Sequence, residues 1–337
     1  MSGPTPRVTV LLPVYNGARH LREAIASVLG QTFTDFELLV VSDGSTDESV
    51  AIARSYADPR VSIVDRRENL GLVATLNEGL TRARGEYVAR QDADDVLRPT
   101  RLATQVRYLD EHHDIAAVGS SVQLLNDDGR SVGVWHYPED PVAARWALLF
   151  NSALAHSSVM FRAARIREAG GYSGRQPHVE DYELWSRLIL TDGLASVHEV
   201  LQGYRLSEAG VSRQQESRQL AGRRQIAREN MARLIGRDVP DDVLQVLLAF
   251  EPIGDRARAR DALALIISLW TAFLEQHSPS PRTAAAIRDL YFQMLLGLLA
   301  RVPSPARHLL VVESLSTLPV HPGFVARLGK LLLKVWA

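Results

Sequence analysis

The sequence of 337 residues contains no cysteine. This absence excludes disulfide bonds, thiolate metal sites and a cysteine nucleophile. Lysine is nearly absent too, because Lys330 and Lys334 are the only two. A catalytic or Schiff-base lysine elsewhere in the chain is therefore excluded. The formal net charge is only −1, so there is no general attraction to nucleic acid, and we expect no nucleic-acid partner.

Long apolar runs are also missing. The longest nearly apolar stretch, Ala262 to Leu274, is interrupted by Ser268 and Thr271 and is well short of the ~20 residues that cross a bilayer. The N-terminal residues Met1 to Arg7 include two prolines and lack the layout of a signal peptide. We therefore expect a cytoplasmic protein, and the content of 46% hydrophobic and 23% charged residues is typical of a soluble globular chain.

Two regions of different character divide the chain. Residues 1–213 alternate apolar, β-branched runs with helical patterns, which predicts an α/β domain with parallel strands and right-handed crossovers. Residues 214–337 show helical patterns only. The first region carries 22 basic and 28 acidic residues (−6) and the second 16 and 11 (+5). We place a domain boundary between residues 213 and 214.

The expected strands follow from short apolar runs, and less regular alternation after residue 115 suggests a mixed edge of the sheet. A turn is expected at residues 13–17, and helices are expected after residues 48, 72, 99 and 178. The strand predictions are Val8–Leu12, Phe36–Val41, Val61–Val64, a strand at Tyr87, Ala116–Val118, Val122–Leu125, an extended Ala153–Phe161 and Val197–Tyr204.

Three carboxylates directly follow the predicted strand at Tyr87: Asp92, Asp94 and Asp95. Open α/β sheets bind ligands at the carboxyl ends of their strands. Acids this close repel one another unless a cation compensates, and Mg²⁺ or Mn²⁺ suits such oxygen ligands. Asp92 and Asp94 are two residues apart, so in an extended segment their side chains face the same way. Both could bind one ion, or one could bind the ion and the other a ribose.

Two further acids end or begin predicted elements. Asp43 follows the second strand and could accept hydrogen bonds from a nucleobase or a ribose, although it could equally be a turn residue before Gly44. Asp181 begins a helix and could act as a general base, or it could simply cap the helix. No P-loop, dinucleotide-binding glycine motif or H-E-x-x-H motif is present.

Together these segments resemble the family-2 glycosyltransferases, the large inverting group with the GT-A fold, over about residues 6–215. The segments that carry the resemblance occur in order along the chain. They are residues 10–17 (VLLPVYNG), 27–33 (SVLGQTF), 36–47 (FELLVVSDGSTD), 69–71 (NLG), 76–80 (LNEGL), 85–90 (GEYVAR), 92–95 (DADD), 156–162 (HSSVMFR) and 180–185 (EDYELW).

The resemblance implies a nucleotide-diphospho-sugar transferase with a Rossmann-like mixed sheet and a C-terminal all-helical region. It implies Asp181 as the general base that deprotonates an acceptor hydroxyl, and a Mg²⁺ or Mn²⁺ ion that stabilises the diphosphate. Asp92-Ala93-Asp94 would be the DXD motif, with Asp94 as the foremost metal ligand and Asp92 beside it. The implied donor-binding residues are Pro13, Tyr15, Asp43, Asn77, Asp92 and Ala93.

Four further residues are candidates for contact with the acceptor or the diphosphate: His156, Glu180, Trp185 and Arg205. A histidine in an extended segment is more often an interior residue with satisfied hydrogen bonds. The chain departs from the family pattern after its last predicted strand, where Ser207 stands at a position that is His in many relatives. Either Arg205 or Arg213 compensates, or this segment closes differently.

The C-terminal region matches no catalytic motif, and its apolar stripes are typical of packing against the catalytic domain or of homo-oligomerisation. The segment Phe324–Trp336 combines apolar residues with Arg327, Lys330 and Lys334. Such a basic amphipathic helix could lie on the inner face of the cell membrane, although docking on the protein is the favoured interpretation.

The sequence therefore predicts a metal-dependent hexosyl- or N-acetylhexosaminyltransferase that uses a nucleotide-sugar donor, with a UDP-sugar expected. Its acceptor would be a bacterial surface glycan or a lipid-linked precursor of the cell envelope. The alternative is a non-catalytic sugar-nucleotide-binding or scaffold protein of the same fold. A sugar-phosphate nucleotidyltransferase is disfavoured because a glycine-rich N-terminal phosphate loop and a lysine are both missing.

Overall fold

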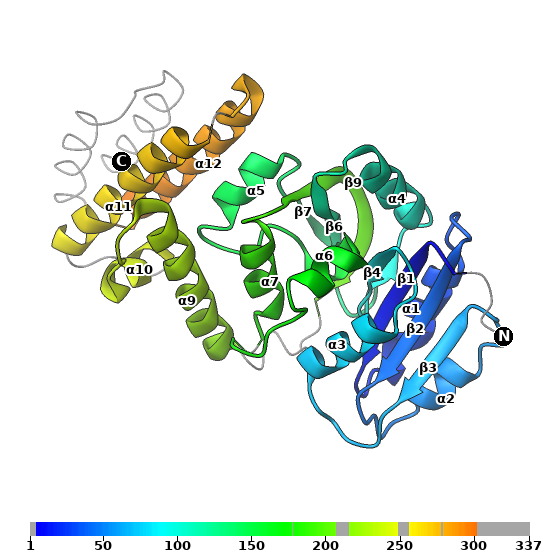
Figure 1. The fold of residues 1–337 in the computed structure, drawn as a ribbon. Helices are drawn as coiled ribbons and strands as arrows, with labels where there is room; N and C mark the ends of the chain where they lie inside the picture. Colours follow the sequence, from blue (N-terminus) through cyan, green and yellow to red (C-terminus); the bar gives the residue numbers. More distant parts are fainter. Residues whose placement is uncertain (1–4, 177, 207–215, 249–255, 278, 302–337) are drawn as a thin grey trace. The chain divides into compact units, whose positions relative to one another are not determined.

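The computed structural model describes residues 5–176, 178–206, 216–248, 256–277 and 279–301. Its N-terminal part is built on a nine-stranded sheet in the order β3-β2-β1-β4-β8-β6-β9-β5, with β7 paired to β6 (Figure 1). The strands are β1 (Val8–Val14), β2 (Phe36–Ser42), β3 (Val61–Asp65), β4 (Tyr87–Arg90), β5 (Val96–Leu97), β6 (Ile115–Leu125), β7 (Ser131–Trp135), β8 (Met160–Arg162) and β9 (Gly193–Arg205).

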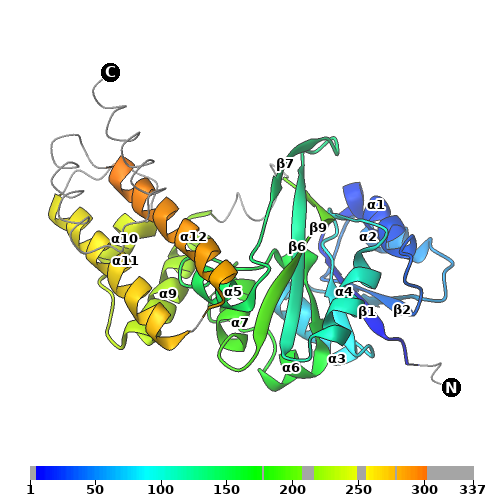
Figure 2. The same cartoon turned by 90° about the horizontal axis from the view of Figure 1, so that it is seen from above.

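The sheet is mixed, as the sequence predicts. Strands β1 to β4 pair in parallel, whereas β8 is antiparallel to both β4 and β6. The long strands β6 and β9 run parallel alongside each other, and β7 adds an antiparallel strand at the far end of β6 (Figure 2).

Helices cover both faces of the parallel half of the sheet. Successive side chains of β1 point to opposite faces, so each face carries apolar side chains against which a helix packs. Val8, Val10, Leu12 and Val14 form one core cluster with α1 (Ala18–Leu29). Leu11 points to the other face, where it meets Gly79 of α3 (Leu72–Arg82). A Cβ at Gly79 would lie 2.2 Å from Leu11 Cδ1, so only glycine permits this close approach.

Two strand boundaries differ from the expectation. Pro13 belongs to β1 instead of a turn and lies opposite Val41 of β2. Proline is tolerated there because β4 pairs only with Val8 to Leu11, so the missing N–H falls beyond the β1–β4 ladder. The two short strands expected between residues 116 and 125 are one continuous strand, β6, with register shifts around Ser120 and Ser121.

The remaining helices of this part include one that the sequence did not predict, α5, and a turn of 3-10 helix, η1, inside the segment expected to be extended. The helices are α2 (Ser49–Arg54), α4 (Arg101–Glu111), α5 (Pro141–Ala147), η1 (His156–Ser158), α6 (Ala163–Glu168) and α7 (Glu180–Leu188). As expected, α7 begins with acids in its first turn, where the helix dipole favours negative charge.

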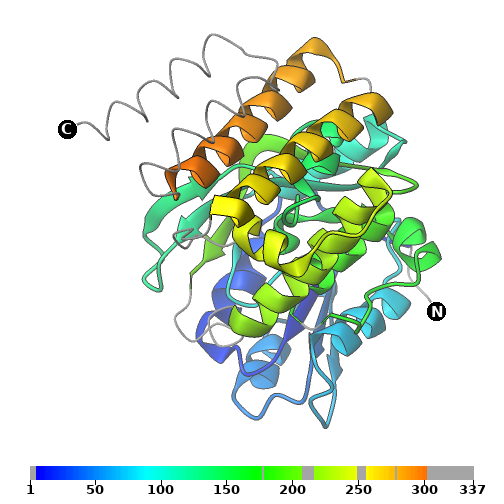
Figure 3. The same cartoon turned by 90° about the vertical axis from the view of Figure 1, so that its left-hand side faces the viewer.

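The chain divides into two compact units, Met1–Gly222 and Arg223–Ala337. The described residues of the second unit are helical, and α11 and α12 lie side by side (Figure 3). No helix in the described ranges is long and apolar enough to span a membrane. The helix expected at Phe324–Trp336 lies outside the described residues. The helices are α9 (Glu216–Ile235), α10 (Asp241–Leu248), α11 (Arg256–Gln276) and α12 (Pro281–Ala300).

Candidate active site

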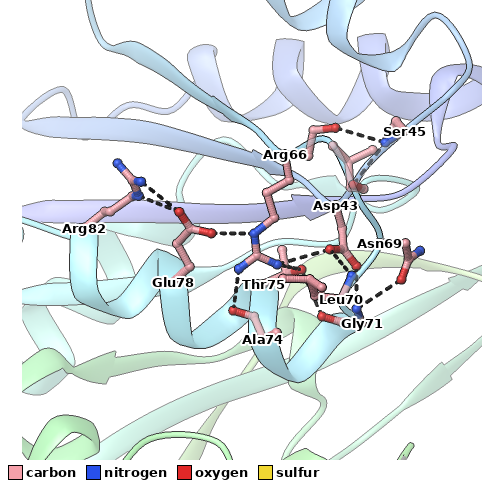
Figure 4. A network of polar contacts seen from close by, with 12 residues as sticks. Asp43, Ser45, Arg66, Asn69, Leu70, Gly71, Ala74, Thr75, Glu78 and Arg82 are labelled. Carbon is pink, nitrogen blue, oxygen red and sulfur yellow. Dashed lines mark hydrogen bonds and ion pairs between the residues drawn. The ribbon is translucent and has the colours of Figure 1, made fainter.

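Asp43 stands directly after β2 and holds the loop that leads into α3. Its Oδ1 accepts hydrogen bonds from the backbone N–H of Leu70 (2.9 Å) and from Arg66 Nη1 (3.1 Å), and its Oδ2 accepts one from Gly71 (2.9 Å) (Figure 4). Gly71 has a φ of +88°, a conformation that favours glycine. Asp43 is only 4% exposed. In this structure the carboxylate therefore fixes the loop.

Arg66 extends this network beyond Asp43, and nothing in the sequence pattern identified it. Its guanidinium also donates to Glu78, to the Thr75 hydroxyl and to the carbonyl of Ala74 on α3 (Figure 4). The loop after β2 is thus joined to the first turns of α3 by charge-assisted hydrogen bonds, which are stronger than neutral ones.

The other residues expected to bind the donor base lie at the end of β1. Pro13 is buried within the strand, whereas Tyr15 is exposed. A Cβ placed on Gly17 would lie 3.3 Å from the Cβ of Ala93. This close approach brings the turn after β1 against the acid-rich loop after β4, so the two predicted donor-binding segments are neighbours.

Residues 91–95 form the acid-rich loop, and hydrogen bonds from β9 to its buried side hold it in place. Asp95 is buried, and its two oxygens accept hydrogen bonds from the Arg205 N–H (2.8 Å) and from Gln202 Nε2 (3.2 Å). Gln91 Nε2 donates to the carbonyls of Asp92 and Asp95. Burial, followed by the charges of Asp92 and Asp94, raises the pKa of Asp95 to about 8. Asp95 is thus the structural member of the three acids.

Asp92 and Asp94 are the half-buried acids of the loop. Burial and the neighbouring Asp92 raise the pKa of Asp94 to about 6. Asp92 forms an ion pair with Arg90, which is itself buried. Burial opposes the charge of Arg90, but Asp92 and the other acids together raise its pKa above the ordinary value. Two carboxylates thus remain close to the surface of this loop.

This pair of acids fits a Mg²⁺ or Mn²⁺ ion. Within the described ranges, no group of three or more His, Asp or Glu side chains is arranged as a metal site. Mg²⁺ does not require one, since it usually takes one or two carboxylates and completes its shell with water and substrate phosphates. The pKa of Asp94 is raised by burial and then by the charge of Asp92, and a bound cation would offset both effects.

The second acidic pair, Glu180 and Asp181, begins α7. Ser152 Oγ donates to Asp181 Oδ2 over 3.3 Å, and Asp181 is half-buried. Glu180 is buried, and burial together with the charge of Asp181 raises its pKa to about 7. The two acids therefore differ, with Asp181 the more accessible of the two.

His156 and Tyr172 connect this pair to α3. The distance between His156 Nε2 and the Tyr172 hydroxyl is 2.9 Å, and the ring of Trp185 lies edge-on to His156. Burial, followed by the charge of Arg90, lowers the pKa of His156 well below its usual value, which keeps the ring neutral. Asn77 of α3 exchanges two hydrogen bonds of 2.9 Å with the backbone of Tyr172. Asn77 and Trp185 thus position Tyr172 and His156.

Arg90 joins the two acidic groups, although the sequence assigned it no role. Besides its ion pair with Asp92, its charge acts on Asp94, Tyr172 and Glu180. After burial and the larger effect of Asp181, Asp92 also contributes to the raised pKa of Glu180. The charge of one buried guanidinium therefore acts both on acids of the loop and on Glu180 of α7. In the described part of the chain, Arg90 Nε has no hydrogen-bond partner.

Arg205 is engaged at the back of the loop. Its Nε donates to the carbonyl of Asp94 (2.9 Å), Nη1 donates to the carbonyls of Asn126 and Asp127, and Nη2 pairs with Glu23 (2.8 Å). In this structure the side chain supports the acid-rich loop. Ser207 and Arg213, which the sequence singled out with it, lie outside the described residues.

The sequence comparisons agree with this architecture. Residues 9–163 match the model of glycosyl transferase family 2. The putative glycosyltransferase EpsE of Bacillus subtilis is 34% identical over 211 residues, covering 60% of this chain and 71% of that protein. The O-antigen biosynthesis glycosyltransferase WbnJ of Escherichia coli is 31% identical over 185 residues, covering 54% and 71%.

Solved structures share the fold. S. aureus TarS 1-349, crystallised with UDP-GlcNAc, superposes with a TM-score of 0.55 at 16% identity, covering 92% of this chain and 89% of that chain. The mannosyltransferase PcManGT of Pyrobaculum calidifontis, in complex with GDP-Man and Mn²⁺, gives 0.53 at 19% identity, covering 92% and 87%. The predicted GT-A fold with a helical C-terminal region is confirmed, and the chain belongs to glycosyl transferase family 2.

Proposed function

We propose that this protein is an inverting glycosyltransferase that transfers a sugar from a UDP-sugar to a hydroxyl of a glycan or a lipid-linked acceptor. The observation that carries the proposal is that buried Arg90 pairs with Asp92 and that its charge also acts on Asp94 and on Glu180, the neighbour of Asp181. UDP-GlcNAc in the related TarS structure supports the choice of donor. The O-antigen role of WbnJ supports a cell-envelope glycan as acceptor.

Asp181 would act as the general base. Ser152 orients one oxygen of its carboxylate. The carboxylate takes the proton of the acceptor hydroxyl as the oxygen attacks the anomeric carbon. The bond from that carbon to the diphosphate breaks on the opposite face, so a single displacement inverts the anomeric centre. Buried Glu180, with a pKa of about 7, would limit repulsion beside the base.

Asp94, with Asp92 beside it, would hold the divalent ion and the donor. A bound Mg²⁺ or Mn²⁺ supplies Lewis-acid stabilisation of the leaving diphosphate. Arg90 fixes the carboxylate of Asp92. The loop that Asp43 holds, together with Tyr15 and Pro13, would form the binding surface for the nucleotide base.

Incubation with UDP-, GDP- and dTDP-sugars, with Mn²⁺ or with EDTA, tests the proposal by measuring release of the nucleoside diphosphate. We expect hydrolysis or transfer with a UDP-sugar that depends on the metal. Asp181→Asn should lower turnover at least about 100-fold while UDP binding is unchanged, since general bases contribute about 10²–10⁴. Asp128→Asn, at an exposed carboxylate, is the matched control.

Two results would count against the proposed reaction. Failure to bind or turn over any of these donors would reject it. Binding of UDP without turnover, unaffected by Asp181→Asn, would favour a non-catalytic sugar-nucleotide-binding protein of the same fold.

A further inference from the structure

An aromatic side chain stands exposed at the end of the edge strand β7. Trp135 is 47% exposed, and its ring lies 5.8 Å from the ring of Tyr204 on β9, tilted by 39°. Neither residue carries a role in the proposed chemistry. Tryptophan and tyrosine are enriched at binding interfaces, because each combines a large apolar ring with a polar group.

The strand register places this aromatic pair on one defined face of the sheet. Trp135 lies opposite Val122 of β6, and Tyr204 lies opposite Leu124 of the same strand. Val122 and Leu124 are two residues apart, so their side chains share a face, where they form a small core with Ala155 and the partly buried Tyr204. Figure 2 shows β7, β6 and β9 alongside one another.

The chain segments that carry this face also contribute residues to the candidate active site. Ala155 immediately precedes His156, whose ring contacts Tyr172 and Trp185. On β9, Tyr204 precedes Arg205, which donates its backbone N–H to Asp95 and its Nε to the carbonyl of Asp94. Ala155, on the same face as the aromatic pair, is therefore adjacent in the chain to His156, whereas Arg205 points to the other face of β9 and supports the acid-rich loop from there.

We propose that Trp135, with Tyr204 beside it, is the stacking platform for a pyranose ring of the acceptor. This proposal rests on the proposed transferase function. The face of an aromatic ring is electron-rich and attracts the partly positive C–H groups on one side of a sugar ring. A single exposed ring suits one saccharide unit, whereas a stable contact between protein copies buries about 800 Å² on each partner.

Saturation-transfer NMR with methyl pyranosides of glucose, galactose and N-acetylglucosamine, recorded with UDP present, tests the platform. We expect at least one glycoside to receive signal on its ring C–H protons. Trp135→Ala should weaken that binding about tenfold or more, and Trp135→Phe should keep most of it. Val134→Ala is the matched control, because Val134 is exposed on the opposite face of β7.

Three outcomes would overturn the platform: equal glycoside binding by the Trp135→Ala and Val134→Ala variants, no glycoside signal from the unaltered protein, or a dimer that Trp135→Ala converts to monomer in sedimentation. Donor hydrolysis without acceptor, measured on the same variants, separates the two proposals. Hydrolysis that persists while Trp135→Ala changes no sugar binding rejects the platform alone. Glycoside binding through Trp135 without any donor turnover rejects the transfer reaction alone.

Discussion

Arg90 and Asp92 form an ion pair at the end of β4 in which the cation is buried and the carboxylate is 31% exposed. The two residues are two positions apart, so an extended backbone turns both side chains to the same side. Arg90 supplies one permanent positive charge near acids that would otherwise repel one another. Its charge also acts on Asp94 and Glu180.

Replacing Arg90 by methionine should destabilise the protein by about 3 kcal/mol, because removing one partner of a largely buried pair leaves the other charge uncompensated. Urea unfolding at neutral pH measures the change. The double variant Arg90→Met/Asp92→Asn should recover part of the loss, and Arg67→Met, at an exposed arginine, serves as control. A single Arg90→Met variant as stable as the unaltered protein would contradict the assigned role.

The contribution of Asp95 to stability should fall as the pH rises from about 4 to about 8. The folded-state pKa of Asp95 is raised to about 8, above its unfolded value of 3.8, mainly by burial and then by Asp92 and Asp94. Across this window the unfolded chain loses the proton that the folded chain retains, so the folded state loses relative stability. Glu180 and Asp94, with raised pKa values of about 7 and about 6, act in the same direction.

Asp95→Asn tests this pH dependence, because asparagine stays neutral and still offers an oxygen to the Arg205 N–H. Urea midpoints measured at several pH values in EDTA should decline less steeply for the variant. Parallel curves for the two proteins would show that Asp95 does not retain its proton in the folded state.

Asp43→Ala should destabilise the fold by about 2 kcal/mol, because the backbone N–H groups of Leu70 and Gly71 and the guanidinium of Arg66 lose the Asp43 carboxylate as an acceptor. The loop at residues 69–71 would no longer be held, so UDP affinity should fall as well. Thermal unfolding and calorimetric titration with UDP measure both effects. Glu68→Gln, an exposed change on the same loop, should alter neither. Normal stability combined with weaker UDP binding would instead assign Asp43 to direct contact with the base.

Asp94→Asn should weaken Mn²⁺ binding in the presence of UDP about tenfold or more, and further than Asp92→Asn does. The reason is that Arg90 already neutralises Asp92, whereas the described residues form no ion pair with Asp94, whose pKa is raised. Calorimetric titration with Mn²⁺ compares the variants, with Asp128→Asn as the control. A larger loss in Asp92→Asn would reverse the order of the two proposed ligands.

Much of the sheet could be predicted from the sequence because buried parallel strands are continuous apolar runs, as in β1 and β2. The boundaries were less predictable. Pro13 suggested a turn, yet it continues β1. Strand β4 pairs only with residues before Pro13, so the N–H that proline lacks would have no partner in that ladder. Two short strands were predicted on either side of residues 119–121, but these residues lie in a buried, continuous strand.

The positions of the acids at the ends of elements could be predicted from the sequence. The hydrogen-bond partners of the candidate site residues could not. Asp92, Asp94 and Asp181 stand at ends of elements, which sequence patterns reveal. The partners of Asp43 are backbone groups of Leu70 and Gly71, which only the folded loop brings within reach. Arg205 was a candidate for contact with the acceptor or the diphosphate, and its side chain is bonded to backbone carbonyls behind the loop. Long-range polar contacts of this kind have no local signature.

The crowding of acids in the loop after β4 has a thermochemical consequence. Near neutral pH the loop retains protons that its carboxyl groups would lose in water, since the pKa of Asp95 is about 8. A divalent cation that binds there must expel part of that proton population into the solvent. The apparent heat of metal binding should then change with the ionisation enthalpy of the buffer. The slope of that heat plotted against the ionisation enthalpy gives the number of protons displaced per ion.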